Sequence, residues 1–436
     1  MEQFKEKLLR HKIISVWGIG YLGYTEIIKL QSRGFKANVF DFTNAGFSEK
    51  IKKNGYPDKE QIYSWSERGN VDEVDISRIN ISEGVKSMFT SNIHILAFPV
   101  VDREGNNLLR KLSNIFLGYK KEIENTLIIF LSAGTPGTID KNFIEIIDRD
   151  KINCSFVSAS RSDWTVEEFL SDSKIRMLAA NDKKSLEKAT FFYNLLGIKY
   201  RILSSIKEAE IYENAKNGFQ YTAEVFINQL AIAYPDTNIR MMIKYFLKDI
   251  ELNESYLTIG AGGYKMPHSV QNILDGSDDP NALSLVKEVQ NANVSMILSY
   301  AEMIKKMGYK SATILGISVK GHQKNIEISP SVILAEYLNK LNVTVYVDDP
   351  FYDKKSLKKL LPFCKFTNIL NDKLQSEVLF VMTDHNKYKF ITQNNIDELD
   401  IYNAALIIDN AALLDEFKFS SSTVYHAIGD GKRVPI

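Results

Sequence analysis

The chain has 436 residues, of which 44% are hydrophobic and 25% are charged, an ordinary balance for a globular protein of two or three domains. Lysine plus arginine equals aspartate plus glutamate, at 54 each, so neither nucleic acid nor a membrane surface is favoured as a partner. Cysteine occurs only at Cys154 and Cys364, which excludes a disulfide framework and a cysteine-rich metal site. The N-terminal residues lack the apolar core of a signal peptide, and no apolar run approaches the roughly 20 residues that span a bilayer. We therefore expect a cytoplasmic protein with no metal site.

Short apolar runs alternate with longer helical patterns through the first 200 residues. Such alternation is typical of βαβ units around a parallel sheet. The strands expected in this part of the chain are 13–17, 37–40, 93–98, 126–131 and 155–158.

Two long helices are predicted in the middle of the chain. Between residues 207 and 234, apolar side chains recur at spacings of three and four, the period of one helix face. This apolar stripe consists of Ile211, Ala215, Phe219, Thr222, Phe226 and Leu230. A second helix is expected over about 282–307, where Gly308 is a natural stop.

After residue 310 the alternation of strands and helices resumes, with strands expected at 312–317, 343–347, 378–382 and 405–408 and a helix at 331–339. The predicted fold class is α/β, with two Rossmann-like α/β domains joined by a long central helix and a helical middle domain. The expected domains are 1–205, 206–308 and 309–436.

A glycine-rich turn follows the first expected strand and opens a helical stretch. It reads Gly18, Ile19, Gly20, Tyr21, Leu22, Gly23. In a dinucleotide site the first glycine permits a tight turn, the second lets the backbone approach a pyrophosphate, and the third lets helix and strand pack closely. The second strand ends at Asp41, where a carboxylate can accept hydrogen bonds from a ribose diol and would repel a 2′-phosphate. The pattern predicts a site for NAD, and the competing interpretation is an ordinary βα turn.

A second constellation reads Gly260-Ala261-Gly262-Gly263-Tyr264-Lys265-Met266-Pro267-His268-Ser269. Further short motifs occur along nearly the whole chain: Ser132 to Thr138, Glu208-Ala209-Glu210 with Asn217 and Phe219, Ile314-Leu315-Gly316 with Lys320, Ser329-Pro330, Asp349-Pro350, and Thr383-Asp384-His385 with Tyr388. With the glycine turn, and in this order, they resemble the UDP-glucose/GDP-mannose dehydrogenase family of nucleotide-sugar dehydrogenases.

The resemblance implies an N-terminal NAD domain, a central helix that forms a homodimer interface, and a C-terminal domain that holds the nucleotide of a sugar donor, with UDP favoured. The substrate would lie in the cleft between the domains. The substrate-binding residues that it implies are Gly260, Gly262, Gly263, Tyr264, Arg161 and Lys320.

The catalytic positions of the family are only partly kept. In the family a cysteine, which falls on Lys265, forms the thioester through which a sugar alcohol becomes a carboxylate. The family's helix lysine falls on Glu213, its helix asparagine on Asn217, and its loop aspartate on Ser269. Other positions differ as well: Ala133 replaces a threonine, Ser160 an acid, Glu327 an arginine, His268 a lysine and His322 an asparagine. The expected catalytic residues are therefore Lys265, Asn217 and Glu213.

Lysine cannot form a thioester, and both cysteines are expected to be packed, inert thiols. Three roles are open for Lys265: an ion pair with Glu213, a general acid or base, or an amine that forms an imine with an aldehyde. A catalytic role for His268 is a weaker alternative.

The leading hypothesis for function is an NAD-dependent oxidoreductase that interconverts an alcohol and a carbonyl on a nucleotide-activated sugar, or that epimerises by oxidation and reduction. A conventional 6-dehydrogenase that makes a uronic acid is a second hypothesis. A homologue that binds nucleotide sugar and NAD without turnover is the third.

Overall fold

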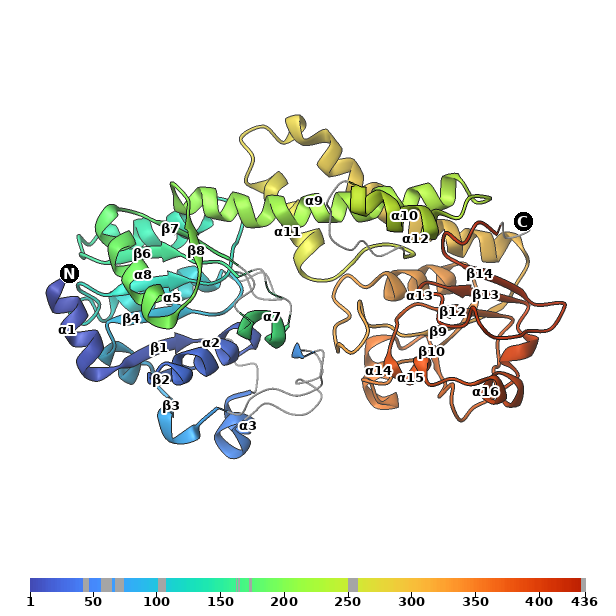
Figure 1. Ribbon diagram of the computed structural model, residues 1–436, viewed down its shortest axis with the longest axis horizontal. Coiled ribbons are helices and arrows are strands. Elements are labelled where there is room, and N and C mark those ends of the chain that lie inside the picture. The colour runs from blue at the N-terminus through green and yellow to red at the C-terminus, as the bar shows by residue number, and fades with distance from the viewer. Residues whose placement is uncertain are drawn as a thin grey trace. The chain divides into compact units, whose positions relative to one another are not determined.

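The structure is a computed structural model that describes residues 1–41, 47–55, 65–66, 74–100, 107–161, 163, 165–171, 175–249 and 258–432. Its internal contacts divide the chain into two compact units (Figure 1). The first unit contains Met1–Lys216 and Gln271–Asp278, and the second contains Asn217–Val270 and Asp279–Ile436. The division falls inside two helices, α9 (Ile206–Ala233) and α11 (Lys265–Asp275). The three domains expected from the sequence, with boundaries at 205 and 308, stay a prediction.

The first unit is a doubly wound sheet, whose described strands run in the order β3-β2-β1-β4-β5-β6-β7-β8. All neighbouring pairs are parallel except β6 and β7. The order reverses between β1 and β4, as in dinucleotide-binding folds. The strands are β1 (Ile13–Trp17), β2 (Lys36–Phe40), β3 (Ile79–Ile81), β4 (Ile93–Leu96), β5 (Leu127–Phe130), β6 (Ser155–Ser158), β7 (Arg176–Ala180) and β8 (Tyr200–Ile202).

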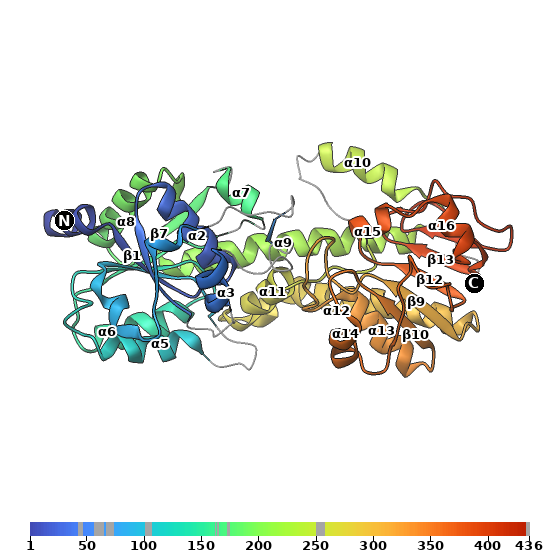
Figure 2. The same cartoon turned by 90° about the horizontal axis from the view of Figure 1, so that it is seen from below.

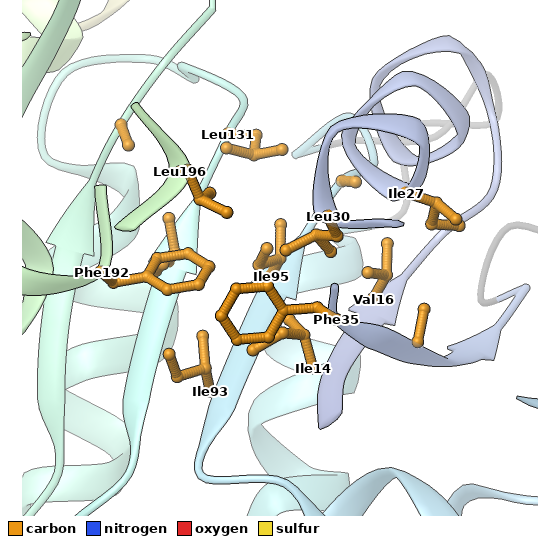
Figure 3. Close-up of a cluster of buried hydrophobic side chains, with 14 of the residues drawn as sticks. Ile14, Val16, Ile27, Leu30, Phe35, Ile93, Ile95, Leu131, Phe192 and Leu196 are labelled. Atoms are coloured by element: carbon orange, nitrogen blue, oxygen red, sulfur yellow. The ribbon is translucent and has the colours of Figure 1, made fainter. Parts of the chain in front are cut away.

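Helices cover both faces of this sheet (Figure 2). Alternate residues of a strand point to opposite faces, so Ile129 joins the core beneath α2 and α8 while Phe130 joins the core beneath α5. Figure 3 shows the first of these cores, where Ile27 and Leu30 of α2 meet Phe192 of α8 over the strands. The helices are α1 (Glu2–His11), α2 (Tyr21–Ser32), α3 (Phe47–Asn54), α5 (Leu108–Leu117), α6 (Glu145–Asp148), α7 (Val166–Leu170) and α8 (Lys183–Leu196), with short helical turns η1 (Ile76–Arg78), η2 (Val85–Thr90) and η3 (Asp140–Ile144).

The second unit is built around an all-parallel sheet, whose described strands run in the order β11-β10-β9-β12-β13-β14. The order reverses between β9 and β12, so this sheet is also Rossmann-like. Together the two sheets confirm the predicted fold class. The strands are β9 (Ser311–Leu315), β10 (Thr344–Asp348), β11 (Lys365–Phe366), β12 (Val378–Val381), β13 (Leu406–Asp409) and β14 (Val424–Ala427).

Helices lie on both sides of the second sheet as well (Figure 2). One core packs α12, α13 and α14 against the strands, and a smaller core on the opposite face packs α15 and α16. The helices are α10 (Ile239–Asp249), α12 (Ser284–Lys306), α13 (Pro330–Lys340), α14 (Lys354–Leu360), α15 (Asn386–Lys389) and α16 (Gln393–Glu398), with short turns η4 (Pro280–Leu283) and η5 (Ile401–Asn403).

Helix α9 confirms the long helix predicted over 207–234. Its apolar stripe points outward, because Ile211, Phe219 and Phe226 are 44%, 63% and 52% exposed. The buried side of the helix is mixed, because it carries apolar residues such as Tyr221, Val225 and Ile227. It also carries a series of polar residues: Glu210, Glu213, Asn214, Asn217, Glu224 and Asn228. The helix therefore presents an apolar surface to its surroundings and places amides and carboxyl groups against its own chain.

Candidate active site

The glycine turn after β1 has the geometry that a pyrophosphate requires. Gly18 has φ +92°, and a Cβ there would lie 2.8 Å from the carbonyl oxygen of Ala97. A Cβ on Gly23 would lie 2.0 Å from the carbonyl oxygen of Gly18. These two glycines are needed for packing. A Cβ on Gly20 would meet nothing within 4 Å, so the protein leaves open space beside this residue.

Gly20 is also the N-cap of α2, and as a glycine it has no side chain that could accept a hydrogen bond from the first turn. The first backbone N–H groups of a helix lack partners within the helix and attract anions. The open space at Gly20 and this uncapped first turn therefore fit a dinucleotide pyrophosphate.

Asp41 lies directly after β2, the neighbour of β1 in the parallel sheet. Its carboxylate accepts a hydrogen bond from the hydroxyl of Ser48 at 3.2 Å. Since parallel strands end at the same edge, Asp41 is at the edge that also carries the glycine turn. A carboxylate in this place fits a ribose diol.

The signature loop, residues 258–263, needs its glycines for packing. Gly260 and Gly263 have φ +98° and +95°, a region that favours glycine. A Cβ on Gly260 would approach Ile297 of α12 at 2.6 Å. At Gly262 it would lie 2.3 Å from the carbonyl oxygen of Ile328. The loop backbone is therefore packed directly against α12 and against the segment before α13.

Three asparagine side chains hold the same loop. Asn293 of α12 makes a reciprocal pair with Ala261, accepting from its N–H and donating to its carbonyl, both at 2.8 Å. Two further amides accept backbone N–H bonds: Asn228 of α9 from Thr258 at 2.8 Å, and Asn410 from Ile259 at 3.0 Å. These asparagines were not predicted. The available signal was Asn293 itself, an amide placed at helical spacing between the apolar residues Val289 and Met296.

Lys265 is the first residue of α11 and is half-buried. One turn later on the same helix, the buried hydroxyl of Ser269 accepts a hydrogen bond from Nδ2 of Asn217 at 3.1 Å. Residues four apart lie on one face of a helix. The structure thus brings together Asn217 and Ser269, with Lys265 on the same face of α11.

Glu213 is buried, and Lys216 donates to its carboxylate at 2.8 Å. Glu213 belongs to the first unit and Lys265 to the second. An ion pair between Glu213 and Lys265 therefore stays a prediction.

His268 and Glu327, two residues that differ from the family's motifs, are neighbours in the second unit. Nε2 of His268 lies 3.6 Å from the carboxylate of Glu327. The ring of His268 also contacts the ring of Tyr264, with centroids 4.7 Å apart. Polar groups able to exchange protons or accept hydrogen bonds thus gather at the first turn of α11.

Lys320 is exposed on the loop that follows β9, at the point where the strand order of the second sheet reverses. Asp349 and His385 brace this loop. The carboxylate of Asp349 accepts from the backbone N–H and hydroxyl of Ser318, each at 3.1 Å, and lies 3.3 Å from Nε2 of His385. Burial opposes its charge, but the bonds from His385 and the backbone hold the pKa of Asp349 below its ordinary value.

Arg161, predicted to bind substrate, is buried in the first unit. Its guanidinium makes a bidentate pair with Asp163 at 2.9 and 2.6 Å. It also donates to the hydroxyl of Thr25 and the carbonyl of Leu22, at 2.8 and 3.1 Å. These bonds all run to protein atoms beneath the start of α2, and a bond from Arg161 to substrate stays a prediction.

Both cysteines are buried, and burial raises the pKa of each thiol to about 12. Cys154 donates to the carbonyl of Ile123 at 3.2 Å, and Cys364 packs in the larger core of the second unit. This confirms that both are packed thiols in protonated form. Neither is a thiolate available for catalysis.

Within the ranges that the structure describes, no group of three or more histidine, cysteine, aspartate and glutamate side chains could hold a metal ion. Over the same ranges, none of the helices combines the length and apolar character needed to cross a membrane.

Comparison with known proteins finds a family model that matches part of the second unit and relatives that align with most of the chain. Residues 313–416 match the model of the UDP-binding domain of the UDP-glucose/GDP-mannose dehydrogenase family. UDP-glucose 6-dehydrogenase of Rickettsia conorii is 23% identical over 377 residues, covering 73% of this chain and 84% of that protein. UDP-N-acetyl-D-mannosamine dehydrogenase of Methanococcus vannielii is 21% identical over 427 residues, covering 94% and 95%.

Solved structures agree on the fold. A UDP-glucose dehydrogenase from Pyrobaculum islandicum superposes with a TM-score of 0.76 at 17% identity, covering 96% of this chain and 97% of that one. The match over residues 313–416 agrees with the order of the motifs along the chain and with the two Rossmann-like sheets: this chain is similar to the UDP-glucose/GDP-mannose dehydrogenase family, and residues 313–416 match the UDP-binding domain of that family.

Proposed function

We propose that the protein is an NAD-dependent oxidoreductase that interconverts an alcohol and a carbonyl on a nucleotide-activated sugar, with a UDP-sugar favoured. In this proposal the reaction stops before a carboxylate forms. The observation that carries it is the absence of a usable thiol: Lys265 occupies the cysteine position, and the chain's two cysteines are buried with raised pKa values.

The first unit supports NAD as the cofactor. Backbone N–H groups in the first turn of α2 would hold the pyrophosphate beside Gly20, where a side chain is missing. Asp41 would accept hydrogen bonds from the ribose diol. When bound, NAD supplies the site that accepts or returns a hydride.

The second unit supports a UDP-sugar as the substrate. The UDP-binding family model covers β9 almost from its start through β13, including the loop that carries Lys320. The charge of Lys320 suits a diphosphate at the edge of the sheet where ligands of doubly wound folds bind. The backbone of Gly260–Gly263, held by Asn293, would position the sugar.

The groups around α11 support proton transfer during hydride transfer. An alcohol that loses a hydride to become a carbonyl must also lose its hydroxyl proton. Lys265, the first residue of α11, carries an amine that would accept or return this proton. Asn217 and Ser269, hydrogen-bonded to each other one turn away, would orient the oxygen of the substrate.

The decisive experiment is the stoichiometry of NADH. Purified protein is incubated with NAD and, separately, with UDP-, GDP- and CDP-sugars, and NADH and products are followed by absorbance and mass spectrometry. We expect one NADH for each sugar carbonyl formed, or none if the sugar is epimerised. Two NADH per sugar with a new carboxylate would refute the proposal. Binding of NAD and nucleotide sugar without turnover would favour the non-catalytic homologue.

Lys265 has a matched test. Lys265→Met removes the amine but keeps the length of the side chain, and we expect it to lower kcat by about 100-fold. Lys287→Met, on the exposed side of α12, is the control and should leave kcat unchanged. Borohydride added during turnover would trap an imine at Lys265. A covalent sugar adduct would assign the amine as nucleophile, and its absence would assign it as acid or base.

We further propose that the protein is a homodimer that buries the apolar stripe of α9. Its exposed Phe219 and Phe226 lie seven residues apart, two turns along one helix face. Light scattering on the purified chain tests this directly. We expect a dimer for the native chain and a monomer for Phe219→Glu, whereas a monomeric native chain would contradict the proposal.

A further inference from the structure

We propose that Arg161 is a positioning residue for the dinucleotide turn and has no role in holding the sugar. With Asp163 it forms a brace, a buried pair that fixes the first turn of α2. This inference rests on the proposed use of NAD. It assigns to Arg161 a role different from the substrate contact that the family resemblance implies.

The brace leaves the guanidinium little freedom. The side chain of Arg161 is only 1% exposed, and its bonds to Asp163 are bidentate. The ring of Phe169 covers one face of the guanidinium, 3.7 Å from its carbon. The remaining bonds run to Leu22 and Thr25, both in the first turns of α2. Arg161 therefore connects the loop after β6 to the helix that begins at the glycine turn.

Asp163 links the brace to Tyr21, the residue that follows Gly20. Its carboxylate accepts a hydrogen bond of 2.6 Å from the hydroxyl of Tyr21, the first residue of α2. Burial and the charge of Asp163 raise the pKa of Tyr21, so the phenol stays protonated and donates. The ring of Tyr21 packs against Trp65, with centroids 5.9 Å apart. Tyr21 is thus held at both its ring and its hydroxyl, which fixes the direction of the backbone N–H groups beside Gly20.

Among the described residues, two buried arginines face two buried carboxylates. Arg161 and a second buried arginine, Arg176, face Asp163 and Glu26; Arg176 donates to Glu26 at 2.8 Å, and Arg161 lies 3.6 Å from it. The formal charges of these four residues are equal and opposite, so we assign their contribution to NAD binding to position and not to attraction of a phosphate. Removing the charge of Arg161 would give the four residues one net negative charge beneath the helix end that is to receive a pyrophosphate.

The charges of Arg161 and Asp163 allow an effect on NAD binding to be separated from a loss of stability. Arg161→Gln leaves a net negative charge, whereas Arg161→Gln with Asp163→Asn is neutral again. We expect the single variant to raise the Kd for NAD by about 100-fold and the double variant to recover about tenfold of that loss. The Kd for UDP, measured on the same samples by calorimetry, should change less than about twofold, because UDP is expected in the other unit. Phe143→Leu, in the core beneath α5, is the control for lost stability alone and should keep the native Kd for NAD.

Tyr21→Phe is a milder variant for the case in which the arginine variants do not fold, since it removes only the hydroxyl bonded to Asp163. It should raise the Kd for NAD by about threefold to tenfold. A weaker Kd for UDP with native NAD binding would overturn the inference and restore Arg161 as a sugar ligand. Native NAD binding in every variant would overturn the brace alone. If the unaltered chain does not bind NAD, the proposed cofactor fails instead.

Discussion

Adding one methyl group at either of two glycines in the same turn is expected to have opposite effects. Gly20→Ala places a Cβ where no protein atom lies within 4 Å, on a backbone with φ −69° that alanine adopts freely. Gly23→Ala places a Cβ 2.0 Å from the carbonyl oxygen of Gly18, a distance at which the backbone must move.

The magnitudes follow from these distances. Gly20→Ala should change the free energy of unfolding by less than about 1 kcal/mol, because the restriction that alanine places on the unfolded chain is opposed by its poorer fit at an N-cap. It should weaken NAD by roughly 10–100-fold, since the methyl group displaces the pyrophosphate from a backbone bond worth about 1.5–3 kcal/mol. Gly23→Ala should lower the free energy of unfolding by about 1–3 kcal/mol or more, through overpacking.

Urea denaturation gives the free energy of unfolding, and calorimetric titration gives the Kd for NAD. The unaltered chain and both variants are measured side by side, with UDP as a second ligand that neither substitution should affect. If Gly20→Ala bound NAD as tightly as the unaltered chain, the pyrophosphate would not lie beside Gly20. Equal loss of stability in the two variants would refute the assignment of open space to Gly20 and close packing to Gly23.

Three further predictions concern buried polar groups. Burial lowers the pKa of His94 from about 6.5 to about 3, so below pH 6.5 the unfolded state binds a proton that the folded state does not. The stability that depends on His94 should therefore be complete above pH 6.5 and fall by up to about 5 kcal/mol towards pH 3. Denaturation curves of His94→Phe should show a weaker dependence on pH. Cys154 and Cys364 should not react with a thiol reagent at pH 8 until the chain is unfolded, and fast labelling of the native protein would contradict their burial. Asn293→Ala removes the partner of both backbone groups of Ala261, which should lower the free energy of unfolding by about 2–4 kcal/mol. It should also weaken UDP-sugar binding, and unchanged binding would show that the sugar does not need this loop.

Much of the fold is predictable because buried parallel strands are continuous apolar runs. The strands expected at 13–17 and 155–158 have those bounds in the structure, and others differ by one or two residues. Five strands were missed: β3, β7, β8, β11 and β14. In β8, for example, the side chains are mostly exposed and form no apolar run. Helix α11 was missed because its first turn contains Pro267 in a glycine-rich segment, yet proline is tolerated in the first turn of a helix.

The candidate site was less predictable, because periodicity shows that a helix has an apolar face but not where that face points. Much of the predicted stripe of α9 is exposed, and the buried face combines apolar residues such as Val225 with polar residues such as Asn217. The partner of Asn217, Ser269, could be found only by aligning motifs, since nothing local links the two residues. The bonds of Arg161 to α2 depend on the tertiary fold and leave no local trace in the sequence.

The way in which the signature loop is held has a consequence for enzymology. Its three clamps, Asn228, Asn293 and Asn410, are amides, and amides neither gain nor lose a proton between pH 4 and pH 10, a range of roughly six units that covers most enzyme assays. The side chains that hold the loop therefore keep the same charge across this pH range, and so the loop should keep its geometry. A pH–rate profile of this protein should report proton transfer at the reacting centre, with little contribution from a loop that rearranges.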